Sequence, residues 1–230
     1  MIKKQFLIIG ILGILLAVIV IIAGASLQPN TSNETPIDTK VSEPESLQAI
    51  LSKADSIRSL SYEIQGTITM PQYPTTTLTI HVWQEKPYLK EDITTQTMGI
   101  STTLTVIVRP EGTYVYNPTL GKYVLTTDIP SYVTSLQYLD PKMIKDLLNN
   151  QTITDYDTEI LDGKLATIVD YNIPVIGENS LAVKIWIWNE KGLPLKATMT
   201  MHMEQITMTM VFLFSQYSFT DIPDNTFNVT

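Results

Sequence analysis

Hydrophobic and polar residues alternate along two stretches of the chain, residues 61–126 and 152–219. Successive side chains of a strand point to opposite faces, so this alternation predicts strands with one dry and one solvated face. The short turns between them predict an antiparallel meander. We expect about eleven strands, at residues 61–70, 77–83, 88–94, 101–109, 112–117, 122–126, 152–161, 164–172, 181–189, 194–203 and 206–219.

Two segments show the spacing of amphipathic helices instead. Residues 45–60 carry an apolar stripe that can cover a sheet, and Ser42 to Glu45 resembles a capping box with a proline in the first turn. Residues 129–150 are helical most clearly at PKMIKDLLNN. A sheet of about eleven strands rarely stays open without curling. The predicted fold is α+β: a single large curled antiparallel sheet, a half-barrel, with helices covering its apolar concave face.

Methionines gather in the last strand pair, where residues 197–214 read ATMTMHMEQITMTMVFLF and hold five of the nine methionines. A turn at residues 204–205 pairs position 203 with 206, 201 with 208 and 199 with 210, which places all five on one face. Flexible, polarizable methionine is common at surfaces that accept variable apolar partners. An ordinary protein core is the alternative interpretation.

The N-terminus differs from the rest of the chain. Phe6 to Ala25 is a run of twenty uncharged residues after Lys3 and Lys4, which predicts a transmembrane helix with a cytoplasmic N-terminus. Residues 26–44 are polar and contain three prolines, as expected of a flexible linker. Residues 45–230 then form one extracytoplasmic domain. Alternatively, residues 1–25 are a signal peptide, and cleavage after Ala25 secretes the protein.

Charge and composition narrow the function. The exported part has 13 basic and 23 acidic residues, a net charge of −10, which disfavours nucleic acid as a partner. The chain has no cysteine, so an exported domain must draw its stability from its own core rather than from disulfides. His81 and His202, its two histidines, fall on the polar faces of strands, and no catalytic or phosphate-binding motif occurs. We expect a protein that is not an enzyme and needs no metal or cofactor.

Other residues allow competing interpretations. Asp155, Asp157 and Glu159 share one face of a strand, either as edge-protecting charges or as ligands of a hard cation, and we favour the former. Trp186 and Trp188 share a face as well, either as a docking patch or as residues covered by other segments. The N-x-S/T pattern marks candidate glycosylation sites at Asn30, Asn33, Asn150 and Asn228.

Several stretches taken together resemble the LolA/LppX-like family of lipoprotein carriers and lipid-binding envelope proteins. The similar segments are LQAILSKADSIRSLSYEIQGTIT, TVIVRPEGTYVYNPTLGKYV, LDGKLATIVDY, VKIWIWNEKGLPLKATM and FSQYSFTDIPDNTF, in the family's order. The resemblance implies an unclosed half-barrel with a helical lid and a cavity for acyl chains. The predicted anchor departs from the free shuttling members, and we transfer none of the family's headgroup-contacting residues to this chain.

The resulting hypothesis is a membrane-tethered binding protein that holds a lipid or lipidated partner in an apolar cavity. The expected cavity wall is Ile64, Ile68, Leu78, Ile80, Val82, Met199, Met201, Met208, Met210 and Phe212. The expected lid is Leu47, Ile50, Leu51, Ala54, Met143, Ile144 and Leu147. The alternative is an envelope sensor or interaction module of the same fold, with a largely filled cavity and a protein partner.

Overall fold

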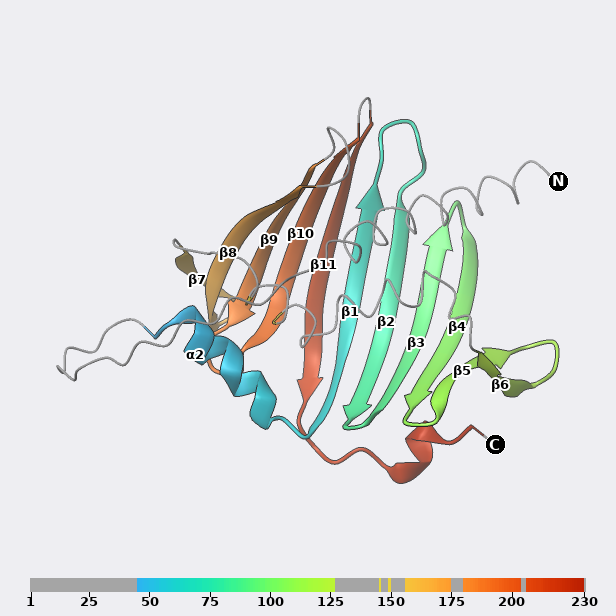
Figure 1. Ribbon diagram of the computed structural model, residues 1–230. Coiled ribbons are helices and arrows are strands. Elements are labelled where there is room, and N and C mark those ends of the chain that lie inside the picture. The colour runs from blue at the N-terminus through green and yellow to red at the C-terminus, as the bar shows by residue number, and fades with distance from the viewer. Residues whose placement is uncertain are drawn as a thin grey trace.

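The computed structural model describes residues 45–126, 145, 149, 156–174, 180–203 and 206–229. Their main feature is one antiparallel sheet of eleven strands (Figure 1), the number expected from the alternation. The strands are β1 (Ser59–Thr69), β2 (Thr76–Glu85), β3 (Tyr88–Thr97), β4 (Ile100–Arg109), β5 (Gly112–Asn117), β6 (Lys122–Thr126), β7 (Asp157–Leu161), β8 (Lys164–Pro174), β9 (Ser180–Trp188), β10 (Leu193–Met203) and β11 (Ile206–Ser218).

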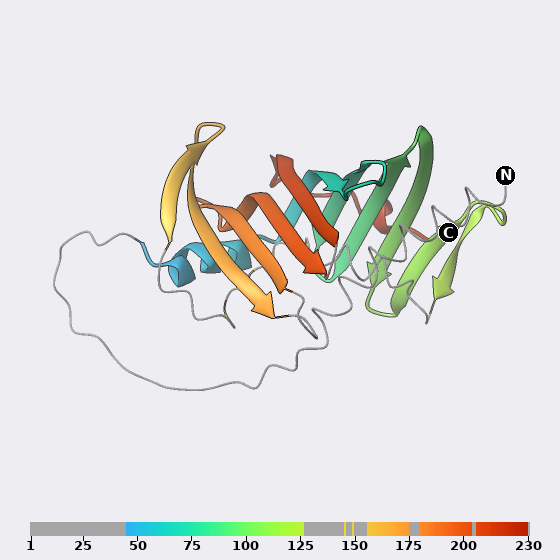
Figure 2. The ribbon, with the colours of Figure 1, turned by 90° about the horizontal axis from the view of Figure 1, so that it is seen from above.

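The strand order shows two meanders rather than the single one predicted. Strands β1 to β6 run outwards in sequence, and β7 to β11 run back from the opposite edge until β11 pairs with β1. The first and last strands therefore lie side by side at the centre, and β6 and β7 lie at the two ends of an open, twisted sheet (Figure 2). Alternation fixes the face of each residue but not the neighbour of each strand, so the sequence pattern left this order undetermined.

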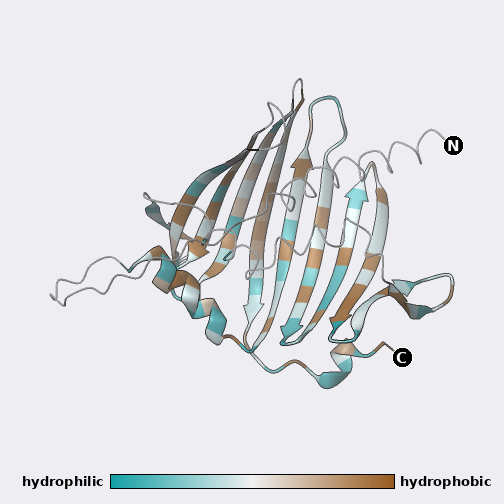
Figure 3. Cartoon of the chain, viewed as in Figure 1, coloured by the Kyte–Doolittle hydropathy of each residue, from teal (hydrophilic) through white to brown (hydrophobic). Residues whose placement is uncertain are grey.

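Cross-strand register confirms the predicted methionine pairing. Met199 lies opposite Met210, Met201 lies opposite Met208, and position 203 lies opposite 206. Apolar and polar bands alternate along the strands (Figure 3), as period-2 side-chain placement requires. One face of the sheet carries the largest core cluster, which includes Ile64, Ile80, Met201 and Met208, and is here called the apolar face. The opposite face, which carries Trp186, is called the outer face.

The helix before the sheet is shorter than predicted. It consists of α2 (Leu47–Ser52) and the 3-10 turn η1 (Lys53–Ser56), whereas the stripe predicted a helix over residues 45–60. Ser46 is the N-cap, because its hydroxyl accepts a hydrogen bond from the backbone N–H of Ala49 at 3.2 Å. The helical segment ends early because Leu60 is buried in the apolar core as part of β1.

A C-terminal tail follows β11 and ends in the 3-10 turn η3 (Asp224–Phe227). Ile222 and Phe227 are buried against Ile107, and the ring of Phe227 stacks on Tyr88 with centroids 5.6 Å apart. The described residues contain no helix long and apolar enough to span a membrane. The predicted anchor Phe6–Ala25 and linker 26–44 lie outside the described residues and remain predictions.

Candidate functional site

The predicted cavity-wall residues lie together on the apolar face. Nine of the ten are at most 5% exposed, and Met199 is partly buried against them. Met201 and Met208, which face each other across β10 and β11, have no exposed surface at all. The structure thus assembles the predicted wall as one surface, while its role as a ligand cavity remains a prediction.

The helical segment covers one end of this face. Ile50 and Leu51 are fully buried in the same core cluster, and Leu47 and Ala54 pack against it while remaining partly exposed. These four are the predicted lid residues that the structure describes. Met143, Ile144 and Leu147 lie outside the described residues.

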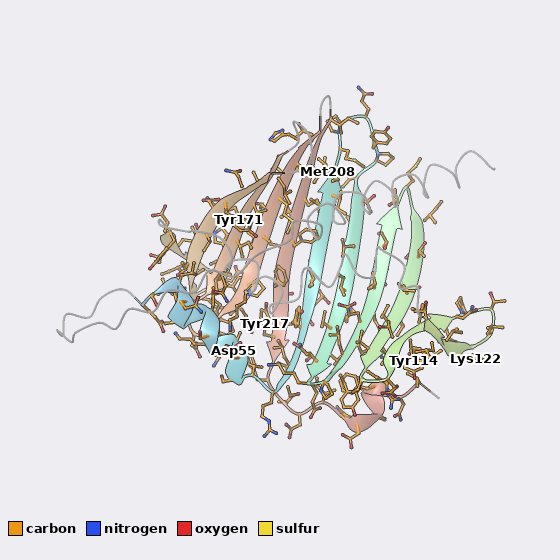
Figure 4. All side chains as sticks on the ribbon, viewed as in Figure 1. Asp55, Tyr114, Lys122, Tyr171, Met208 and Tyr217 are labelled. Atoms are coloured by element: carbon orange, nitrogen blue, oxygen red, sulfur yellow. The ribbon has the colours of Figure 1, made fainter. Side chains whose placement is uncertain are left out.

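Polar contacts hold the helical segment to the sheet. The Lys53 ammonium donates to the backbone carbonyl of Asn189 at 2.6 Å and to the Glu45 carboxylate at 2.7 Å. Lys145 forms an ion pair with Asp55, whose side chain is 61% exposed (Asp55 is labelled in Figure 4). Water screens the Asp55 side of this ion pair, whereas the Lys145 side chain is only 12% exposed.

A void of about 70 Å³ lies where the helical segment meets the sheet. Its lining includes Ala54 and Ile57 from the helical side and Leu60 and Leu193 from the sheet. This pocket is partly open to solvent, and the rest of its lining is polar or charged: Asp55, Gln84, Lys86 and Lys145.

Two polar side chains interrupt the apolar face, and the sequence reasoning missed both. Glu91 is 3% exposed between the buried Val82 and Val106, its cross-strand neighbours. Tyr171 is 8% exposed, and its hydroxyl has no hydrogen-bond partner among the residues that the structure describes. Burial raises the pKa of the Tyr171 hydroxyl far above its ordinary value of 10.0. Tyr171 follows the apolar Val169 by two residues in β8, so the alternation of faces would have placed it on the apolar face.

The outer face carries aromatic rings covered by lysines. The Lys196 ammonium lies 4.5 Å from the ring centroid of Trp186, and that of Lys184 lies 5.5 Å from it. The indole N–H of Trp186 donates to Glu159 on the edge strand β7 at 2.7 Å. Trp186 is therefore 7% exposed and is part of a small outer cluster rather than an open docking patch.

The two histidines make local polar contacts on their strands. His81 Nδ1 lies 3.3 Å from the Glu63 carboxylate, and His202 contacts Thr207 at its exposed strand end. A separate pocket of about 610 Å³, lined in part by Lys53, Trp188 and Asn189, lies beside the β9–β10 turn. Among the glycosylation candidates, Asn228 is exposed after η3, whereas Asn30, Asn33 and Asn150 lie outside the described residues.

Among known proteins, only solved structures match this chain, and they do so at low identity. No family model and no curated protein matches the sequence. The crystal structure of the LolA superfamily protein NE2245 from Nitrosomonas europaea is 14% identical, with a TM-score of 0.38, covering 80% of this chain and 98% of that one. LprF from Mycobacterium bovis is 13% identical, with a TM-score of 0.38, covering 76% and 96%.

A structure of the Pseudomonas aeruginosa MucA/MucB complex also matches, at 13% identity and a TM-score of 0.40. It covers 80% of this chain but 61% of the matched chain. Identities and TM-scores this low do not indicate a ligand or a partner for this chain. Of the matching structures named here, NE2245 is described as a LolA superfamily protein.

Proposed function

We propose that this protein is a non-enzymatic, extracytoplasmic envelope protein that binds a lipid or a lipid-modified partner on the apolar face of its sheet. In this proposal residues 6–25 tether it to its own membrane, and residues 26–44 let the domain move near that membrane. The observation that supports binding is the continuous apolar face, in which Met201 and Met208 meet across β10 and β11 near their hairpin end.

Binding requires a segment that covers the face to move. Met201 and Met208 have no exposed surface, so no ligand reaches them in this conformation. The helical segment covers the end of the face beside Leu60 and Leu193, and its displacement opens that end. Met201 and Met208 lie at the opposite end of the strands, so a chain that enters there must extend along the face to reach them. Unbranched methionine side chains can then rearrange around an inserted chain.

The free energy of such binding comes from removing the ligand's tail from water. Each buried methylene contributes about 0.8 kcal/mol, so ten methylenes contribute about 8 kcal/mol before ordering costs. Those costs remove several kcal/mol, which leaves micromolar or weaker binding. Affinity in this range permits exchange of the ligand with a membrane.

Photo-crosslinking tests this proposal with the full-length chain. The protein is placed in vesicles that contain a phospholipid with a diazirine in its acyl chain, illuminated and digested. We expect labels on Met199 and Met201 but not on Thr198 and Thr200, which alternate with them on the outer face. Labelling confined to residues 6–25 would refute lipid binding by the sheet.

The alternative function is an envelope sensor or interaction module with a filled interior. The absence of any exposed surface on Met201 and Met208 favours it, since a packed core has the same property. The crosslinking experiment separates the two, because a filled interior takes up no acyl chain.

The location of the domain can be tested independently. The chain has no cysteine, so a single Asp221→Cys substitution at an exposed position gives one labelling site. A membrane-impermeant maleimide should label this variant in intact cells whose outer permeability barrier has been opened. Labelling only after lysis of the cytoplasmic membrane would contradict the predicted orientation.

A further inference from the structure

The hydroxyl of Tyr171 is a buried polar group without a partner. Tyr171 lies on β8, is 8% exposed, and its hydroxyl makes no hydrogen bond within the described ranges of the chain. Buried polar groups in folded proteins are nearly always hydrogen-bonded, because an unpaired group has lost its water without compensation. Tyr171 lies where β8, beyond its pairing with β7, forms the edge of the sheet. An unpaired hydroxyl at this edge of the apolar face is therefore a cost to the unliganded protein.

Buried threonines at the sheet behave differently. Thr167, with no exposed surface, donates to the side-chain oxygen of Asn189 at 2.8 Å. Thr76, 4% exposed, shares a 2.8 Å hydrogen bond with Thr97. The fold thus supplies partners for the hydroxyls of Thr167 and Thr76. It supplies none among the described residues for Tyr171, and a ligand can explain this difference.

The position of Tyr171 places it within the predicted binding surface. A row of cross-strand neighbours crosses five strands of the sheet, from Tyr171 through Val183, Met199 and Met210 to Ile68. Three of these five residues belong to the predicted cavity wall. Figure 4 shows Tyr171 on β8 and, further along the sheet, Met208 on β11. A chain that lies along this row brings its polar end close to the Tyr171 hydroxyl.

The chemistry of the hydroxyl limits what it can bind. Burial raises the pKa of Tyr171, so the phenol remains protonated at any physiological pH and can donate a hydrogen bond. A carboxylate at this position would be a buried charge without a cationic partner, which is strongly unfavourable. A neutral carbonyl oxygen accepts the hydrogen bond without that cost.

We propose that Tyr171 selects ligands by donating a hydrogen bond to a neutral acyl ester or amide carbonyl. The ligand class is then an acylated lipid or acylated protein, rather than a free hydrocarbon or an ionised fatty acid. This inference rests on the proposed function, since it needs a ligand on the apolar face. It adds the specificity of the site and names the residue that provides it.

A competition experiment measures this selectivity. The full-length protein is placed in vesicles of a diether phosphatidylcholine, which contains no ester carbonyl, and labelled with a diazirine-bearing hexadecane. The competitors are methyl hexadecanoate and octadecane, which have chains of equal length. For each protein we take the ratio of the ester's effectiveness in displacing the probe to that of octadecane. We expect this ratio to be about five to ten times larger for wild type than for Tyr171→Phe. Membrane partitioning is the same for both proteins and cancels when the two ratios are compared.

The matched control is Tyr62→Phe, which removes a hydroxyl from another buried tyrosine of the same core cluster. It should keep the wild-type ratio. An equal ratio in wild type and Tyr171→Phe would refute the selection by Tyr171 while leaving the proposed function intact. Failure of the probe to label the sheet of the wild type would refute the proposed function, and this inference with it.

Infrared spectroscopy gives a readout that a purely structural role of Tyr171 would not change. Methyl hexadecanoate labelled with carbon-13 at its carbonyl is bound to the same vesicle-embedded protein. The bound carbonyl band should move to lower frequency with wild type and Tyr62→Phe, and should remain at its unbonded position with Tyr171→Phe. If Tyr171→Phe does not fold, the wild type alone decides, because an unshifted bound carbonyl would overturn the inference.

Discussion

Gly192 in the β9–β10 turn lies directly against the backbone of Ile50 in α2. A Cβ at Gly192 would fall far inside contact distance of the Ile50 carbonyl oxygen and 3.1 Å from that of Leu51. The turn also has a positive φ of 67° at this residue. Two backbones that approach this closely define the closed position of the helical segment over the end of the apolar face.

Gly192→Ala is therefore expected to lower the free energy of unfolding by about 2–4 kcal/mol. The clash is with backbone atoms, which cannot rotate away, and alanine is also strained at positive φ. Chemical denaturation measures the change. Gly121→Ala is the matched control, since Gly121 has a φ of 63° with nothing within 4 Å of its would-be Cβ. Equal losses in the two variants would contradict close packing at Gly192.

Met208→Ala should destabilise the protein by about 2–4 kcal/mol, because it leaves a cavity opposite the fully buried Met201 on the apolar face. Met208→Leu should cost less than about 1.5 kcal/mol, since it nearly conserves volume. Thr209→Ala, one residue along on the exposed side of β11, should change stability by less than about 0.5 kcal/mol. A comparable loss at Thr209 would mean that the assigned faces are wrong.

The stability of the protein should fall as the pH rises above about 10, the ordinary tyrosine pKa. The folded protein keeps the proton of Tyr171 because burial raises its pKa, whereas the unfolded chain releases it near pH 10. The unfolded state then binds fewer protons, so each further pH unit removes up to about 1.4 kcal/mol of stability until the folded pKa is reached.

Tyr171→Phe should remove this contribution, and the difference between the two proteins isolates it from lysine titration. It should also leave stability at pH 7 unchanged or higher, because an unpaired buried hydroxyl is lost. Parallel stability curves of wild type and Tyr171→Phe between pH 9 and pH 11 would show that the hydroxyl is not buried.

Glu159→Ala should destabilise the edge strand β7 by about 1 kcal/mol, because the indole N–H of Trp186 loses its acceptor. Hydrogen exchange of the β7 amides is the most direct measurement, with a change in tryptophan fluorescence as a second readout. Asp157→Ala alters an exposed carboxylate on the same strand and face and should have little effect. Faster exchange in the Asp157 variant alone would show that the Glu159–Trp186 hydrogen bond is not what stabilises β7.

Much of the fold could be predicted from residue patterns. The positions of eleven strands, the common face of the methionines and the pairing of Met201 with Met208 follow from side-chain periodicity. Periodicity is a local property, and each strand expresses it in its own sequence. The lid residues from Leu47 to Ala54 were recognisable for the same reason.

Features that depend on distant contacts were not predictable. The pairing of β1 with β11 joins segments more than a hundred residues apart, and many sheet orders satisfy the same alternation. The helical stripe extended to Ile57, yet the burial of Leu60 in the sheet ends the helix before it. Glu159 was interpreted as a solvated charge because its acceptor role appears only once β9 places Trp186 beside it.

The sequence by itself determined which residues are dry, because hydrophobicity and strand period act within each segment. It determined that one face of the sheet is apolar and where the methionine side chains lie on that face. The tertiary structure alone decided that the first and last strands of the sheet, β1 and β11, pair at its centre. It also decided that the Tyr171 hydroxyl has no hydrogen-bond partner among the described residues. Whether a polar atom is satisfied depends on every segment that packs around it, and no local pattern carries that information.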